Sequence, residues 1–145
     1  MAGVFIVAID APSVFSRIGR DLVKRLLEYG AEVVAISRTK KHLDSLEEEV
    51  KTIKLKTIHA DLSDWNTARR AAQEAGPIDC LVNNAAVAIL EPFFDIKPES
   101  IDDSFNTNVK SIINLSQVIA KGMVDRKKGG SIVNISSQAA KARHN

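Results

Sequence analysis

The chain has 145 residues, of which 45% are hydrophobic and 26% are charged, and its formal net charge is +2. This composition is typical of one globular domain, so we expect residues 1–145 to form a single unit. The small net charge gives no support for a nucleic acid or a membrane partner. The single cysteine rules out a framework of internal disulfides, and three widely separated histidines give no support for a metal site.

The amino-terminal stretch is apolar, but it lacks the basic leader of a signal peptide and is far too short to span a membrane. A single cysteine also favours a reducing compartment. Together these features predict a cytoplasmic protein.

The chain begins with an apolar stretch and continues with an amphipathic one. Residues 3–9 are apolar and rich in β-branched side chains, which is typical of a parallel strand buried on both faces. The next segment, 10–17, is predicted to turn the chain, because Pro12 cannot occupy a central strand. Apolar side chains then recur at helical spacing from Ile18, and Gly30 is expected to end this helix.

Strand and helix patterns continue to alternate. Residues 31–37 predict a second buried strand, followed by a charged helix that begins after Lys41. Residues 55–60 predict a third strand. Carboxylate and hydroxyl groups at 61–64 then suit the cap of a helix over 65–75.

A short apolar run at 78–86 predicts a strand in the middle of the sheet. A loop over 87–97 follows it, and Pro98 suits the first turn of a long amphipathic helix. The glycine pair at 129–130 should break that helix. Residues 131–135 then predict a fifth strand.

Alternating strands and helices with short connections predict an α/β fold, a Rossmann-like, doubly wound parallel sheet with strand order 3-2-1-4-5. The carboxyl ends of the first and fourth strands then lie side by side, where such folds bind dinucleotides. Asn83 and Asn84 end the fourth strand at this point, and Ala85 would let a ligand approach the backbone closely. The alternative is that the two asparagines only cap a turn.

The residues that follow the second strand are Ser37, Arg38 and Thr39. An arginine at this place accommodates the 2′-phosphate of a nucleotide, so Arg38 favours NADP over NAD. Asp61 and Leu62, after the third strand, could border the adenine, although a helix cap explains Asp61 equally well. Ser136 and Ser137 place hydroxyl groups at the same rim after the fifth strand.

Five segments of the chain, in order, carry a resemblance to a known family. They are residues 34–39, 61–65, 76–88, 105–109 and 131–138. On these segments the chain resembles the short-chain dehydrogenase/reductase family, and more narrowly its L-xylulose (dicarbonyl) reductase branch. Several motifs in the family's order make the resemblance specific, and it covers most of the chain.

The resemblance implies hydride transfer between NADP(H) and the carbonyl group of a sugar or dicarbonyl substrate, in a homo-oligomer. It implies that Ser137 polarises the substrate carbonyl and that Asn108 holds a proton-relay water. The residues that it implies around the nucleotide are Ile18, Gly19, Ser37, Arg38, Thr39, Asp61, Leu62, Asn83, Asn84 and Ala85.

The sequence departs from the family at the general acid. The family's Tyr-x-x-x-Lys segment follows the catalytic serine, whereas this chain stops at Asn145, and its only tyrosine is Tyr29. General acid catalysis contributes about 10²–10⁴ in rate. We therefore expect the sheet to be incomplete at the carboxyl end and this chain alone to be inactive.

A second departure concerns the glycine turn that wraps the pyrophosphate in the family. The family's turn positions fall on Pro12, Ser13, Arg17 and Gly19, so only the last glycine survives. Arg17 can bind a phosphate by its charge or fill the space that the phosphate needs, and we expect the second.

The missing segment is also expected to leave one side of the long helix, with Phe105, Ile112 and Ile119, partly uncovered. Three hypotheses follow for the function of the chain. It is a fragment or variant of an NADP-dependent carbonyl reductase, a non-catalytic chain that binds full-length subunits, or a non-functional product. The residues favour the first.

Overall fold

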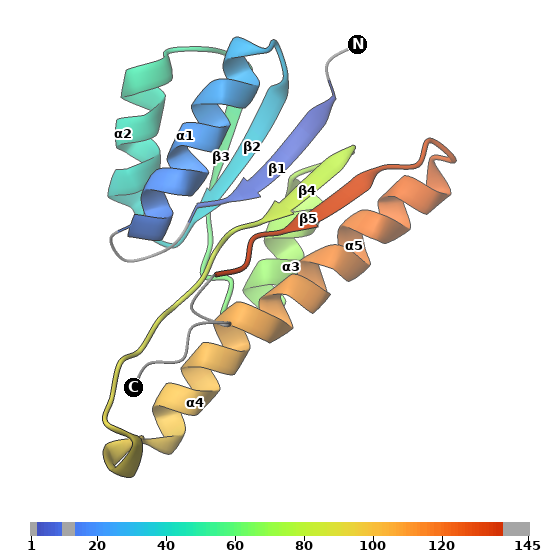
Figure 1. The fold of residues 1–145 in the computed structure, drawn as a ribbon. Helices are drawn as coiled ribbons and strands as arrows, with labels where there is room; N and C mark the ends of the chain where they lie inside the picture. Colours follow the sequence, from blue (N-terminus) through green and yellow to red (C-terminus); the bar gives the residue numbers. More distant parts are fainter. Residues whose placement is uncertain (1–2, 10–13, 138–145) are drawn as a thin grey trace.

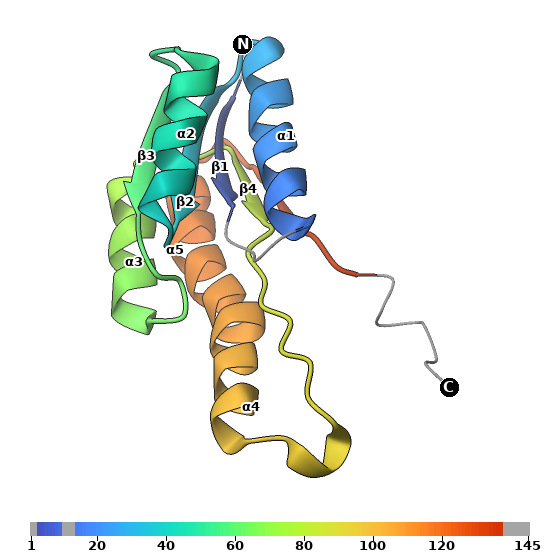
Figure 2. The same cartoon turned by 90° about the vertical axis from the view of Figure 1, so that its left-hand side faces the viewer.

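In the computed structural model, residues 3–9 and 14–137 are described, and their strands form one parallel sheet (Figures 1 and 2). The strand order is β3-β2-β1-β4-β5, which confirms the predicted order 3-2-1-4-5. The strands are β1 (Val4–Ala8), β2 (Glu32–Ser37), β3 (Leu55–His59), β4 (Cys80–Asn83) and β5 (Ser131–Asn134).

Helices cover both faces of this sheet. They are α1 (Val14–Glu28), α2 (Lys40–Val50), α3 (Trp65–Glu74), α4 (Pro98–Phe105) and α5 (Ser111–Asp125). Helices α1 and α2 lie on one face, and α3 and α5 lie on the other (Figures 1 and 2). None of the helices within the described ranges combines the length and the apolar character needed to cross a bilayer.

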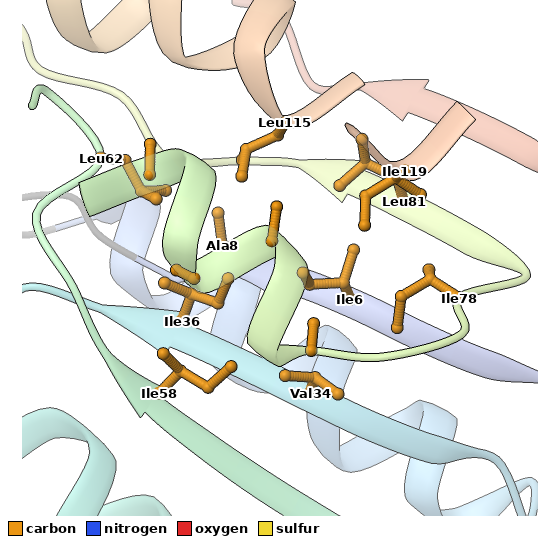
Figure 3. Close-up of a cluster of buried hydrophobic side chains, with 14 of the residues drawn as sticks. Ile6, Ala8, Val34, Ile36, Ile58, Leu62, Ile78, Leu81, Leu115 and Ile119 are labelled. Atoms are coloured by element: carbon orange, nitrogen blue, oxygen red, sulfur yellow. The ribbon is translucent and has the colours of Figure 1, made fainter. Parts of the chain in front are cut away.

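Alternate residues of the inner strands point to opposite faces, so the sheet separates two apolar cores. In β1, Ile6 faces α3 and α5, whereas the next residue, Val7, faces α1 and α2. Figure 3 shows the first core, in which Leu115 and Ile119 of α5 meet side chains of the strands and α3. Burial on both faces explains why these strands read as continuous apolar runs.

The first helix begins earlier than the sequence predicts. We expected residues 10–17 to turn the chain and the helix to start at Ile18, but α1 starts at Val14. The expectation was wrong for residues 14–17, because a proline excludes a central strand and yet is compatible with the residues just before a helix. Apolar periodicity also marks only the side of a helix that packs, not its first turn.

The predicted long helix is continuous in the chain but not uniform. A π-helical turn over Asn106–Lys110 joins α4 to α5. A short 3₁₀ turn, Phe93–Asp95, lies in the segment that the sequence predicts as a loop. Residues at a π-helical turn shift relative to the helix on either side, which hydrophobic periodicity alone does not reveal.

The uncovered side of this helix differs in part from the expected one. Phe105 is 55% exposed, as expected, but Ile112 is half-buried and Ile119 is only 3% exposed. Ile119 packs in the core shared with α3, so its predicted exposure was wrong. Four exposed apolar side chains of this helix form a row, namely Ile101, Phe105, Val109 and Ile113. They recur every four residues, which keeps them on one side of the helix.

The cap of α3 is Asp64, whose carboxylate accepts a hydrogen bond from the Thr67 backbone at 2.7 Å. Hydrogen bonds from the Thr67 side chain and backbone lower the pKa of the Asp64 carboxyl group. Asp61, the alternative cap, accepts instead from the backbone and hydroxyl of Ser63. The carboxylate and hydroxyl groups at 61–64 thus order two successive turns.

Asn114 connects α5 to α3 from a fully buried position. Its amide nitrogen donates to the Trp65 carbonyl at 2.6 Å, and its amide oxygen accepts from the Arg69 guanidinium at 3.2 Å. A buried amide with both ends paired fixes how two elements pack, because either end alone would be costly to leave unpaired.

We expect Asn114→Ala to lower the free energy of unfolding by about 2 kcal/mol, because it leaves the Trp65 carbonyl and Arg69 without their buried partner. Asn106→Ala is the control, since the Asn106 side-chain oxygen accepts an exposed hydrogen bond from Lys110. That variant should change stability by less than about 0.5 kcal/mol. Urea unfolding followed by circular dichroism measures both, and equal effects would contradict this role of Asn114.

Candidate active site

The candidate site lies where β1 and β4 end side by side at the carboxyl edge of the sheet. Asn83 and Asn84, which follow Val82 there, are each only 3% exposed. The Asn84 amide nitrogen donates to the Ala8 carbonyl at 3.1 Å, and that of Asn83 donates to the Asn134 amide oxygen at 2.8 Å. Both bonds reach neighbouring strands, so these side chains do more than cap a turn.

The amide oxygens of the same two residues are buried and have no hydrogen-bond partner among the described residues. Buried acceptors without partners are uncommon, because an unpaired polar group loses its bonds to water. Here two of them lie at the point where an open α/β sheet binds its ligand.

Gly19 lies where the first turns of α1 come closest to the sheet. A Cβ atom at this position would lie 2.7 Å from the Asn84 amide nitrogen, 3.0 Å from the Ile9 side chain and 3.3 Å from the Ile9 Cα atom. The missing side chain therefore permits the close helix–strand contact that a dinucleotide fold needs.

The structure brings together four of the predicted nucleotide-binding residues at a small recess of about 10 Å³. Its lining includes Arg38 after β2, Asp61 and Leu62 after β3, and Ala85 after β4. Thr107, from the π-helical turn, lines it too and had not been predicted. Residues far apart in sequence meet here because the parallel strands β2, β3 and β4 all end at this edge.

Three other predicted residues occupy different environments. Ser37 is fully buried, and its hydroxyl accepts a hydrogen bond from the Thr39 backbone at 3.0 Å. This bond shapes the turn that carries Arg38 out of β2. Ile18 is 46% exposed on α1, next to Gly19.

Asn108 lies in the π-helical turn and pairs with the chain that leaves β4. Its amide group accepts from the Val87 backbone N–H and donates to the Val87 carbonyl, both at 2.8 Å. The side chain thus holds the loop beyond the central strand, and its water-binding role stays a prediction. Ser137, the other predicted catalytic residue, is exposed three residues after the end of β5.

Arg17 is exposed in the first turns of α1 and lines a hollow of about 120 Å³ with Ile9, Arg20 and His42. The Arg20 guanidinium forms an ion pair with Glu49 at 2.6 Å, and among the described residues Arg17 is the other arginine that lines this hollow. The expected obstruction of a phosphate by Arg17 stays a prediction. Pro12 and Ser13 lie outside the described residues.

Tyr29 is 82% exposed and follows the carboxyl end of α1, where the chain returns to the start of β2. It therefore lies at the amino edge of the sheet, opposite the candidate site. Among the described residues, no group of three or more His, Cys, Asp or Glu side chains is arranged to hold a metal ion.

The family comparison agrees with this geometry. The family model for short chain dehydrogenases matches residues 14–145. The chain belongs to the short-chain dehydrogenase family. This assignment accounts for the strand order, the close approach at Gly19 and the polar residues at one edge of the sheet.

Among curated members of this family, the chain is 48% identical over 123 residues to an L-xylulose reductase from Mesocricetus auratus and 47% identical to carbonyl reductase (NADPH) 2 from Sus scrofa. Each match covers 85% of this chain and 50% of the relative, so the chain spans about half the length of these proteins. The matches support the L-xylulose reductase branch that the sequence predicts.

A solved structure matches over nearly the whole chain. This closed form of serine dehydrogenase, complexed with NADP⁺, is 26% identical and superposes with a TM-score of 0.82. The match covers 97% of this chain and 56% of that one. A nicotinamide cofactor is therefore consistent with the fold.

We expect Gly19→Ala to lower the free energy of unfolding by about 2 kcal/mol, because the new Cβ atom would press on Ile9 and Asn84. Gly122→Ala on α5 is the matched control, since its Cβ atom would meet only the Arg126 side chain, at 3.4 Å. Alanine favours a helix over glycine, so that variant should gain about 1 kcal/mol. Thermal unfolding measures both, and a neutral Gly19→Ala variant would refute the close contact.

Proposed function

We propose that this chain is the NADP(H)-binding part of a carbonyl reductase that acts on L-xylulose or on related sugar and dicarbonyl substrates. The observation that carries this proposal is the recess at the carboxyl edge, where Arg38, Asp61 and Ala85 meet. The recess is too small to enclose an adenine, so the base would lie across its mouth. The names of the related reductases support the substrate class.

Each residue has a separate part in nucleotide binding. The Arg38 guanidinium binds the 2′-phosphate, since its planar set of donors matches phosphate oxygens. Asp61 and Leu62 border the adenine. On the nicotinamide side, the buried oxygens of Asn83 and Asn84 supply hydrogen-bond acceptors that have no partner among the described residues.

When bound, the cofactor supplies a hydride to the substrate carbonyl carbon. Ser137 donates a hydrogen bond to the carbonyl oxygen and so stabilises the negative charge that develops on it. Asn108 holds the segment that begins at Val87 through two hydrogen bonds. In the proposed reaction it also binds the water that relays the proton. Tyr29 lies at the opposite edge of the sheet, so it is not placed to act as the general acid of this reaction.

A second function is favoured by one observation, the apolar stripe of Ile101, Phe105, Val109 and Ile113. In this second proposal the chain does not catalyse but associates through this stripe with full-length subunits of a related reductase. Mixing the two proteins and measuring mass by light scattering tests it, with Phe105→Glu as the disrupting variant. A chain that neither binds subunits nor binds nucleotide would be a non-functional product.

The nucleotide proposal is tested by titrating the chain with NADPH and NADH and following nicotinamide fluorescence. We expect saturable binding that prefers NADPH, and Arg38→Ala should weaken NADPH binding by about tenfold or more, because a charge-assisted bond to phosphate is lost. NADH binding should not change, since NADH has no 2′-phosphate.

Lys41→Ala is the charge-matched control for Arg38→Ala, because Lys41 is exposed in the first turn of α2. This variant should bind NADPH as the parent chain does. An equal loss of NADPH affinity in both variants would mean that NADPH responds only to the overall positive charge of this surface, not to a specific bond from Arg38. A cooperatively folded chain that binds neither nucleotide would contradict the proposal and support obstruction by Arg17.

A further inference from the structure

We propose that Asn134 is a positioning residue that holds Ser137 at the carboxyl edge of the sheet, by locking β5 in register with β4. The proposal rests on the function suggested above only in the role that it gives Ser137. Its structural part concerns contacts between β4 and β5, which need no ligand.

Apart from the contacts described below, few interactions fix the register of strand β5 against β4. Among the described strands it pairs with β4 alone, at the edge of the sheet, and all four of its residues are exposed. Ile132 and Val133 keep 39% and 43% of their surface exposed. The register of a strand with such limited burial is weakly specified, and a slip of one residue turns every side chain to the opposite face. Such a slip would also move Ser137, because only three residues separate it from Asn134.

The start of β5 is restricted at Gly130. A Cβ atom there would lie 2.9 Å from the Asp79 carbonyl oxygen and would overlap the Met123 side chain. The next residue, Ser131, donates its backbone N–H to the same carbonyl at 3.0 Å. Only a residue without a side chain can pass beneath α5 at this point, so the entry of the strand is held at one position.

The end of β5 is restricted by Asn134. Its amide oxygen accepts from the Asn83 amide nitrogen at 2.8 Å, and the two residues are partners in the parallel ladder. The next residue, Ile135, donates its backbone N–H to the Asn83 carbonyl at 2.9 Å. The Ser116 hydroxyl lies 3.5 Å from the same Asn83 nitrogen and is a much weaker partner.

A slipped register would break this pair. It would place Val133 or Ile135 opposite Asn83, and neither side chain can accept a hydrogen bond. Since Asn83 is only 3% exposed, its amide nitrogen would then lose its best partner in a place that water barely reaches. Asn134 therefore selects one register, and that register places Ser137 at the edge where Asn83 and Asn84 lie.

The test is residue-by-residue amide hydrogen exchange, measured by NMR on the full 145-residue chain without nucleotide. In Asn134→Ala, we expect the Ile135 amide to exchange about fivefold faster or more, as the loss of one paired amide implies. The amide resonances of Ser136 and Ser137 should shift, whereas the exchange of the Val34 and Ile36 amides in β2 should stay as it is.

Two further variants separate positioning from general stability. Asn134→Asp keeps an acceptor oxygen at the same place, so it should restore the parent exchange at Ile135. Ser131→Ala alters the same exposed strand without touching the pair and should have no effect. Unchanged exchange at Ile135 in Asn134→Ala, equal acceleration in β2, or no rescue by aspartate would overturn the proposal. None of these results depends on NADPH binding, so failure of the proposed function would be seen separately.

Discussion

The contact between Gly19, Ile9 and Asn84 is the constraint on which the candidate site depends. Because Gly19 has no side chain, α1 can lie directly against the ends of β1 and β4. The Asn84 amide completes this arrangement by bonding to the Ala8 carbonyl of the neighbouring strand. One small residue and one buried amide thus bring helix and strands together at the edge where the nucleotide is proposed to bind.

Side-chain amide groups then order the rest of this edge. Asn83 pairs with Asn134 across to β5, Asn108 pairs with Val87 in the loop beyond β4, and Asn114 connects α5 to α3. Asn83 and Asn114 are buried, so a mismatched neighbour would leave a donor or acceptor unpaired where water barely reaches. Such bonds add modest stability, but they discriminate strongly between one packing arrangement and its alternatives.

The helix formed by α4, the π-helical turn and α5 has two different sides. One side, with Leu115 and Ile119, belongs to the core shared with α3 and the sheet. The other side exposes Phe105 and Val109, which would be unusual for a surface that contacts only water. Of the two proposed functions, the first concerns the recess at the carboxyl edge of the sheet, and the second concerns this exposed apolar stripe.

The sequence by itself determined the order and type of the elements and the edge at which the site lies. Continuous apolar runs, helical spacing and glycine stops are local signals, and parallel crossovers leave few ways to arrange them. The family motifs also predicted Arg38, Asp61, Leu62 and Ala85, which the fold brings to one recess.

Only the tertiary structure decided which side of the long helix is uncovered, where α1 begins, and what the buried amides contact. The covered side of the long helix and the contacts of the buried amides depend on partners more than 20 residues away, and no local pattern reports them. The matching Val-Asn ends of β4 and β5 were a visible signal, but only the register of the ladder shows that Asn83 and Asn134 are partners.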